Sequence, residues 1–124
     1  MKELLTKSVE DYLEAIYIFE EKGDSNIQSL KIANYLNVSK PAVTKAMNKL
    51  QEDGFIEKEF YGTIKLTSEG RKIGKEVYDK HLTIKKFLLS IGVSEENAEI
   101  DCCKIEHNIC DETLQKIKEF NNKN

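Results

Sequence analysis

Residues 29–54 read SLKIANYLNVSKPAVTKAMNKLQEDG, and they set the architecture of the chain. Apolar residues recur at helical spacing on both sides of a two-residue turn at 37–38. This predicts one helix over residues 29–36 and another from Ser39 to a stop at Gly54. Ser39 is a favoured N-cap, and the proline two residues later is tolerated in a first helical turn. Two helices joined by so short a turn are typical of a helix-turn-helix.

The flanking segments complete a winged helix-turn-helix. Upstream, apolar residues at helical spacing predict a helix over residues 8–21. Downstream, two β-prone runs at residues 55–60 and 63–67 flank a Tyr-Gly pair, which predicts a hairpin. We therefore expect residues 1–70 to form a winged-helix DNA-binding domain.

The second half of the chain is expected to be helical. Its apolar spacing predicts helices over residues 68–91, 94–109 and 111–120, with a frayed tail after the last one. The fold class is therefore mainly α, with a winged helix-turn-helix followed by a helical domain over residues 71–124.

Small and apolar residues in this half indicate close packing and self-association. Gly70 and Gly74 lie four residues apart, which permits a neighbouring element to approach the long helix closely. Apolar positions exceed what so small a core needs, and this predicts a homodimer with a shared helical core. These positions include Ile84, Phe87, Leu88, Ile91, Ile100 and Ile105.

A cationic helix face predicts contact with DNA. Residues 25–51 hold four lysines and no acid, whereas residues 94–124 hold eight acids against four lysines. Because the duplex is polyanionic, a binding element gains from cations and loses from acids. The alternative is an ordinary solvated lysine-rich face. The residues expected to contact DNA are Ser39, Lys40, Pro41, Thr44, Lys45, Asn48, Lys49 and, at the tip of the hairpin, Tyr61.

A second cluster predicts a metal site. Cys103, Glu106 and His107 fall at i, i+3 and i+4 of the helix expected over residues 94–109, so they share one face. The full set of candidate ligands is Asp11, Glu14, His81, Cys103, Glu106 and His107. Such mixed donors suit Mn²⁺, Fe²⁺, Co²⁺ or Ni²⁺, or two adjacent ions, and include too many carboxylates for a structural zinc site. Taken singly, each residue has an ordinary alternative as a surface acid, a structural histidine or a small buried cysteine.

The cysteines leave a rival function open. Their odd number, three, argues against a disulfide framework. Cys102 and Cys103 point roughly 100° apart on a helix, so we do not expect both to face one metal ion. A redox-sensing winged-helix regulator using Cys102, Cys103 or Cys110 is one alternative. A carboxylate-rich metalloenzyme is another, but no additional nucleophile or phosphate-cradling loop supports it, and we expect no enzyme.

The remaining features of the sequence bear on location. No run of about 18 apolar residues is present to span a membrane, and the N-terminus lacks the apolar core of a secretory signal. We therefore expect a cytoplasmic protein with no membrane partner.

Five segments resemble the metal-dependent repressor family that includes the diphtheria toxin repressor and the manganese transport regulators. They are residues 8–17 (SVEDYLEAIY), 38–44 (VSKPAVT), 66–70 (LTSEG), 80–81 (KH) and 105–107 (IEH), and they keep the family's order over nearly the whole chain. The resemblance implies a winged helix joined to a helical dimerisation domain, with metal bound between them. It is to the two-domain form, without the SH3-like domain of longer members.

The resemblance also assigns the ligands. The residues that match ligand positions of the manganese branch are Asp11, Glu14, His81, Glu106 and His107. Cys103 departs from that branch, which has a glutamate there, and is similar to the iron-responsive diphtheria-toxin-repressor branch. That second branch has a methionine where this chain has Asp11. The hybrid set implies Fe²⁺ or Mn²⁺ as the cofactor, with one or two ions per subunit.

These features together predict a metal-dependent transcriptional repressor that controls genes of iron or manganese uptake. As a homodimer it would bind a palindromic double-stranded operator whose half-sites lie one or more helical turns apart. A cation that bridges the two domains would fix the separation of the recognition helices and so favour the DNA-binding state.

Overall fold

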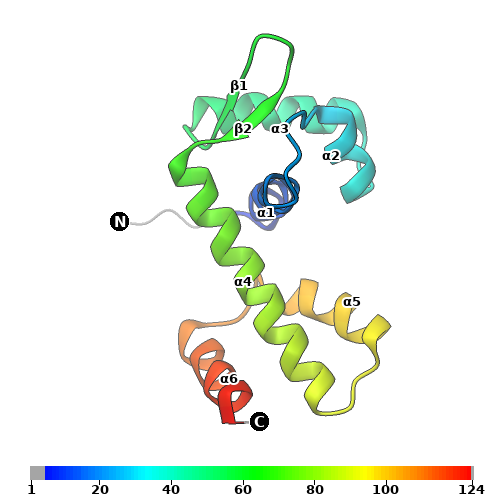
Figure 1. Ribbon diagram of the computed structural model, residues 1–124, viewed down its shortest axis with the longest axis vertical. Coiled ribbons are helices and arrows are strands. Elements are labelled where there is room, and N and C mark those ends of the chain that lie inside the picture. The colour runs from blue at the N-terminus through cyan, green and yellow to red at the C-terminus, as the bar shows by residue number, and fades with distance from the viewer. Residues whose placement is uncertain (1–4, 124) are drawn as a thin grey trace. The chain divides into compact units, whose positions relative to one another are not determined.

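The computed structural model describes residues 5–123, which divide into two compact units at Lys75 and Glu76 (Figure 1). The domain boundary expected after residue 70 falls within α4, the helix that runs through this division. The elements, in chain order, are α1 (Lys7–Glu21), α2 (Ser29–Leu36), α3 (Lys40–Glu52), β1 (Ile56–Lys58), β2 (Ile64–Leu66), α4 (Ser68–Ser90), α5 (Glu95–Ile105) and α6 (Asp111–Lys123).

The first unit is a helix-turn-helix packed on α1. Asn37 ends α2 with a left-handed backbone (φ 56°), and the Ser39 side chain caps α3 by accepting a hydrogen bond from the Ala42 amide at 3.2 Å. Apolar side chains from all three helices are fully buried between them, among them Leu13, Ile16, Ile32, Val43 and Met47. The predicted helices and their turn are therefore confirmed.

A short antiparallel hairpin forms the wing. Ile56 pairs with Leu66 across the two strands, and Gly62 turns the loop between them with φ 81°. The amide of Ile64 donates to the Ile27 carbonyl oxygen at 2.8 Å, which ties the hairpin to the segment between α1 and α2. The wing is thus tied to the unit at the first residue of β2, and its loop extends from the unit (Figure 1).

Two glycines let the first turns of α4 pack closely within this unit. A Cβ at Gly70 would lie 2.0 Å from the Phe55 carbonyl oxygen, and one at Gly74 would lie 2.6 Å from that of Leu13 and 2.9 Å from Cβ of Tyr17. Any side chain larger than hydrogen would force the backbones apart. The close packing predicted from the glycine spacing is confirmed.

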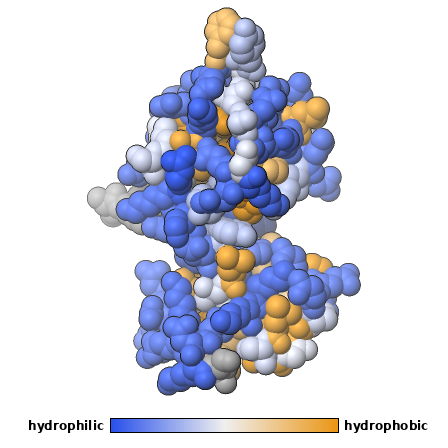
Figure 2. Space-filling view, in the orientation of Figure 1, coloured by the Kyte–Doolittle hydropathy of each residue, from blue (hydrophilic) through white to orange (hydrophobic). Residues whose placement is uncertain are grey.

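The second unit has a small core contributed by three helices. Ile84 of α4, Cys102 of α5 and Leu114 of α6 are buried together, with Leu88 and Ile105 packed against them. Ile84 was predicted to be surplus to the core of one chain, but it is 1% exposed and belongs to that core. Exposed apolar side chains remain on this unit, including Leu82, Leu89, Ile91, Ile100 and Phe120, and Figure 2 shows such patches among hydrophilic surface.

Two predicted helix ends are wrong. The helix expected to reach residue 109 ends at Ile105, because the Asn108 side chain donates to the Lys104 carbonyl oxygen at 2.9 Å and closes the last turn. The tail expected to fray is helical to Lys123, because Asn121 is buried and its Nδ2 donates to the Thr83 carbonyl oxygen at 3.0 Å. Across residues 5–123, no helix combines the length and apolarity needed to cross a membrane.

Candidate metal centre and nucleic-acid interface

The polar face of α3 is exposed as the sequence predicted. Every side chain expected to contact DNA is exposed, namely Ser39, Lys40, Pro41, Thr44, Lys45, Asn48, Lys49 and Tyr61. Five of these line a shallow open depression along α3: Lys40, Pro41, Thr44, Lys45 and Asn48. Asn48 Oδ1 accepts a hydrogen bond from Lys58 Nζ of β1 at 2.7 Å, so α3 and the wing are held to each other. The cationic face is therefore exposed, and one of its residues contacts the wing.

The tip of the wing carries an aromatic pair of which the sequence analysis named one member. Phe60 is 90% exposed and Tyr61 is 82% exposed, and their rings meet edge to face with centroids 4.7 Å apart. Figure 2 shows a hydrophobic group protruding at this end of the molecule. The sequence could have indicated Phe60, because this residue directly precedes the predicted turn and lies outside the alternating pattern that buries every second strand residue.

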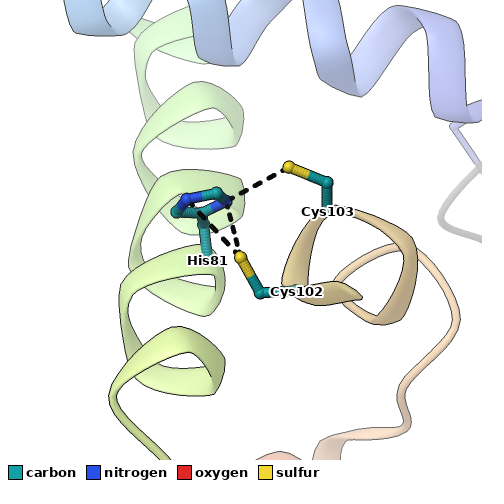
Figure 3. Close-up of side chains that lie close together, drawn as sticks. All are labelled: His81, Cys102 and Cys103. Atoms are coloured by element: carbon teal, nitrogen blue, oxygen red, sulfur yellow. Dashed lines mark hydrogen bonds between the residues drawn. The ribbon is translucent and has the colours of Figure 1, made fainter. Parts of the chain in front are cut away.

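The second unit brings a histidine and two thiols together. His81 projects from α4, and Cys102 and Cys103 of α5 both point toward its ring (Figure 3). The Nδ1 atom of His81 lies 3.5 Å from the Cys102 sulfur and 3.8 Å from the Cys103 sulfur. All three candidate donor atoms lie within 4.8 Å of one another.

Glu106 and His107 join the same site from the end of α5. Glu106 is the C-cap of the helix, and its Oε1 lies 3.5 Å from His81 Nδ1 and 3.8 Å from His107 Nε2. The other carboxylate oxygen, Oε2, is buried and has no hydrogen-bond partner among the described residues. Cys103 and Glu106 are therefore close to His81, and His107 lies beside Glu106, beyond the end of the helix rather than on it.

A carboxylate fixes the opposite edge of the histidine ring. Glu99 Oε1 lies 3.2 Å from His81 Nε2, and its second oxygen lies 2.9 Å from Lys85 Nζ. The hydrogen bond from Lys85 lowers the pKa of Glu99, so this carboxylate stays ionised. With the proton on Nε2, His81 donates to Glu99. The Cys102 sulfur lies 3.6 Å from Nε2 as well as 3.5 Å from Nδ1, so it sits over the ring rather than along the Nδ1 lone pair.

Cys102 and Glu99 are the residues that the sequence analysis missed. We did not expect Cys102 and Cys103 to face one metal ion. Both sulfurs lie near the His81 ring, with Cys102 close to both ring nitrogens and Cys103 close to Nδ1. Burial raises the pKa of Cys102 to about 12, and its sulfur donates to the Glu99 carbonyl oxygen at 3.3 Å. The sequence did contain an indication of both residues. Glu99, Cys102 and Glu106 are three and four positions apart, which puts them on one face of a helix.

Asp11 and Glu14 lie in the first unit. They occupy adjoining turns of α1, and both are half-buried. Neither acid belongs to the core, because the buried residues of α1 are Leu13, Ala15, Ile16 and Tyr17.

The second unit passes a test for metal binding. A buried carboxylate oxygen without a partner is costly, and a cation would satisfy it. Thiol sulfur, imidazole nitrogen and carboxylate oxygen are all ligands of transition metals. The donor set at His81, Cys103, Glu106 and His107 therefore fits a divalent ion.

Comparison with known proteins identifies both units. Residues 4–64 match the iron-dependent repressor N-terminal DNA-binding domain. Residues 67–124 match the iron-dependent repressor metal-binding and dimerisation domain.

Relatives agree over most of their length. An uncharacterised helix-turn-helix-type transcriptional regulator of Methanocaldococcus jannaschii is 39% identical over 117 residues, covering 94% of this chain and 94% of the relative. The regulator MntR of Geobacillus kaustophilus is 42% identical over 113 residues, covering 90% of this chain and 79% of the relative.

A solved structure gives the same result. The structure of the manganese regulator SloR matches with a TM-score of 0.82 and 28% identity over 95% of this chain, which spans 55% of the SloR chain. These findings place the protein among DNA-binding regulators and not among enzymes, as predicted. The chain belongs to the iron-dependent repressor family, and it is a metal-dependent transcriptional repressor with an N-terminal winged helix and a C-terminal metal-binding and dimerisation domain.

Proposed function

We propose that the repressor binds its operator when Fe²⁺ or Mn²⁺ is held by residues of both units. The ligands proposed are Asp11, Glu14, His81, Cys103, Glu106 and His107. The observation that carries this is the buried Glu106 carboxylate, 2% exposed, with one oxygen unpartnered among residues 5–123 and two imidazoles beside the other. A bound cation would neutralise the negative charge of this buried carboxylate.

The acidic ligands make DNA binding depend on metal. Asp11 and Glu14 belong to the DNA-binding unit and Glu106 to the other, and their like charges disfavour a shared site without a cation. Once neutralised, these side chains would hold the two units of each subunit in one arrangement. In a homodimer this sets the distance between two α3 helices, which must match half-sites of a palindromic operator. Metal is then a ligand of the DNA-binding state.

The face of α3 is proposed to read the operator. Lys40, Lys45 and Lys49 supply charge toward phosphates, while Thr44 and Asn48 offer groups for base edges. Ser39 and Pro41 lie at the start of α3, where the backbone amides of the first turn would favour a phosphate. Tyr61 at the tip of the wing would reach the adjacent backbone or minor groove.

The ligand chemistry favours Fe²⁺ over Mn²⁺. SloR is described as a manganese regulator, and this supports an uptake gene for iron or manganese as the target. Cys103, however, offers a soft thiolate, and soft donors favour Fe²⁺ and later metals. The hard carboxylates of Asp11 and Glu14 still admit Mn²⁺, so the preference is partial.

Anaerobic titration of a labelled operator tests the proposal. Binding should require metal and disappear with a chelator, and Fe²⁺ should act at lower concentration than Mn²⁺. Cys103→Glu should move the preference toward Mn²⁺, and Cys103→Ala should weaken activation by every metal. Equal operator affinity with and without metal would exclude the switch, and an unchanged metal ranking in Cys103→Glu would exclude the thiol as the selector.

A further inference from the structure

The loop of the wing holds two large aromatic side chains in contact with water. Phe60 is 90% exposed and Tyr61 is 82% exposed, and neighbouring apolar groups left so open commonly mark a binding surface. We propose that this aromatic tip, Phe60 with Tyr61, enters the minor groove of the operator beside the segment that α3 contacts. This inference rests on the proposed reading of the operator by α3 and deepens it, because it adds Phe60 and an apolar contact to a cationic face.

A tight turn presents the two rings at the outermost positions of the hairpin. The Gly62 amide donates to the Glu59 carbonyl oxygen at 2.9 Å, so Phe60 and Tyr61 are the two central residues of a β-turn. The Glu59 amide donates to the Thr63 carbonyl oxygen at 2.8 Å and closes the loop behind them. The two rings meet edge to face with centroids 4.7 Å apart. Each ring therefore limits the motion of the other, which reduces the entropy lost on binding.

The place of the aromatic tip in the first unit favours DNA as its occupant. Lys58 Nζ of β1 donates to Asn48 Oδ1 of α3 at 2.7 Å, and Phe60 follows Lys58 by two residues. Two residues of extended chain span about 7 Å, so a duplex held by α3 has the aromatic tip within reach. The first unit is the DNA-binding domain, whereas dimerisation belongs to the domain that follows it. The tip is therefore assigned to the duplex rather than to a second copy of the chain.

The hairpin supplies no net charge for this contact. Residues 56–66 hold two lysines and two glutamates. Lys65 Nζ lies 2.7 Å from Glu59 Oε1, and Lys65 is paired with Glu57 across the two strands. Because its cations are balanced by acids, we expect the hairpin to bind through the apolar surface of its tip. Proteins that bind the minor groove frequently place apolar side chains such as phenylalanine in it, and the Tyr61 hydroxyl offers a donor to the acceptors on its floor.

Affinity and its salt dependence distinguish an apolar contact from an ionic one. The probe is a duplex that the full-length wild-type protein selects from random double-stranded DNA in the presence of Mn²⁺. Phe60→Ala should bind this duplex at least about tenfold more weakly, the order expected when an aromatic contact with DNA is lost. The slope of log affinity against log salt should not change, because no counterion is involved. Tyr35→Ala, at an aromatic residue of the first unit that is 51% exposed, is the matched control and should bind as the wild type does.

A modified base locates the contact in the minor groove. Replacing adenine with 2,6-diaminopurine adds an amino group to the minor groove and leaves the major-groove edge as it was. In the segments that flank the α3 contact, this replacement should weaken binding by the wild type but not by Phe60→Ala. Unchanged affinity of Phe60→Ala, a lower salt slope, or equal sensitivity of both proteins to diaminopurine would overturn the inference.

Two further measurements on the same duplex keep the proposals apart. Equal affinity of the wild type with and without Mn²⁺ would reject the metal switch alone. Unchanged affinity and salt slope in Lys45→Ala would reject the α3 face as the reader. Neither result depends on Phe60, so a failure of the aromatic tip is recognised by the Phe60→Ala measurements independently of both.

Discussion

The two units place their proposed functional residues in opposite environments. In the first unit, the side chains that form the core, such as Ile16 and Met47, are distinct from the exposed lysines of the proposed DNA face. In the second unit, Cys102 is at once a core residue and a neighbour of the proposed metal ligands. The proposed DNA-binding face lies on the surface of one unit, whereas the proposed metal site adjoins the core of the other.

This difference has an energetic consequence. A substitution on the exposed face of α3 changes binding with little effect on folding, because surface positions contribute little to stability. A substitution at Glu106 alters a buried charge, so it changes the metal-free protein as well as the metal site.

The largest expected difference is between two thiols of the second unit. Burial raises the pKa of Cys102 to about 12, whereas the hydrogen bond with Thr113 lowers the pKa of the exposed Cys110. At pH 8 the thiolate should be at least about 1000-fold more abundant at Cys110. Alkylation of metal-free protein, followed by mass spectrometry, should therefore modify Cys110 far faster.

The pH dependence has a definite sign. The rate at Cys110 should level off at a pH below that of an ordinary thiol, while the rate at Cys102 should continue to rise toward about pH 12. In denaturant, the control condition, both thiols should react alike. Similar rates in the folded protein would show that Cys102 is not held in a core.

The second prediction concerns the buried carboxylate. Glu106→Gln keeps the shape and removes the charge, so the metal concentration needed for operator binding should rise at least about 100-fold. The metal-free protein should melt no lower than the wild type, because a buried anionic oxygen without a partner is removed. Glu112→Gln, at an exposed acid, is the control and should change neither quantity. A large loss of metal-free stability would give Glu106 a structural role.

The sequence predicted most of the first unit because its signals are local. The cap at Ser39, the turn after α2 and the glycine spacing in α4 each depend on residues a few positions apart. Such local patterns predict the structure correctly because the tertiary packing favours the same conformations as the local sequence does.

The second unit shows where such patterns fail. The end of α5 depends on one side chain, Asn108, and no periodicity reports it. The contact between Cys102 and His81 depends on the packing of α5 against α4, because the two residues are 21 positions apart in the chain. The angle between adjacent helical side chains was correct, but it could not reveal a third residue facing both. The ligand set proposed from the sequence remains a prediction.

A third prediction tests the packing of the first unit. Gly74→Ala should destabilise the protein by about 2 kcal/mol, because its Cβ would lie 2.6 Å from the Leu13 carbonyl oxygen. Lys72→Ala, at an exposed position of the same helix, should stay within about 0.5 kcal/mol of the wild type. Denaturant unfolding measures both. The alkylation rate of Cys102 in folded Gly74→Ala should be unchanged, and a faster rate would show that packing in the first unit controls the second.

The smallest effect is expected on the surface of α3. Lys45→Ala removes one exposed cation, so the slope of log affinity against log salt should fall by about 1. Near 0.1 M salt, that slope corresponds to about tenfold weaker operator binding. The melting temperature should not change, because Lys45 contributes nothing to the core. Lys116→Ala, which removes the same charge from α6 of the second unit, is the matched control and should leave the slope intact. If both variants lower the slope equally, DNA binding depends on the net charge of the protein rather than on the face of α3. The proposed placement of DNA binding on the surface of the first unit would then be wrong.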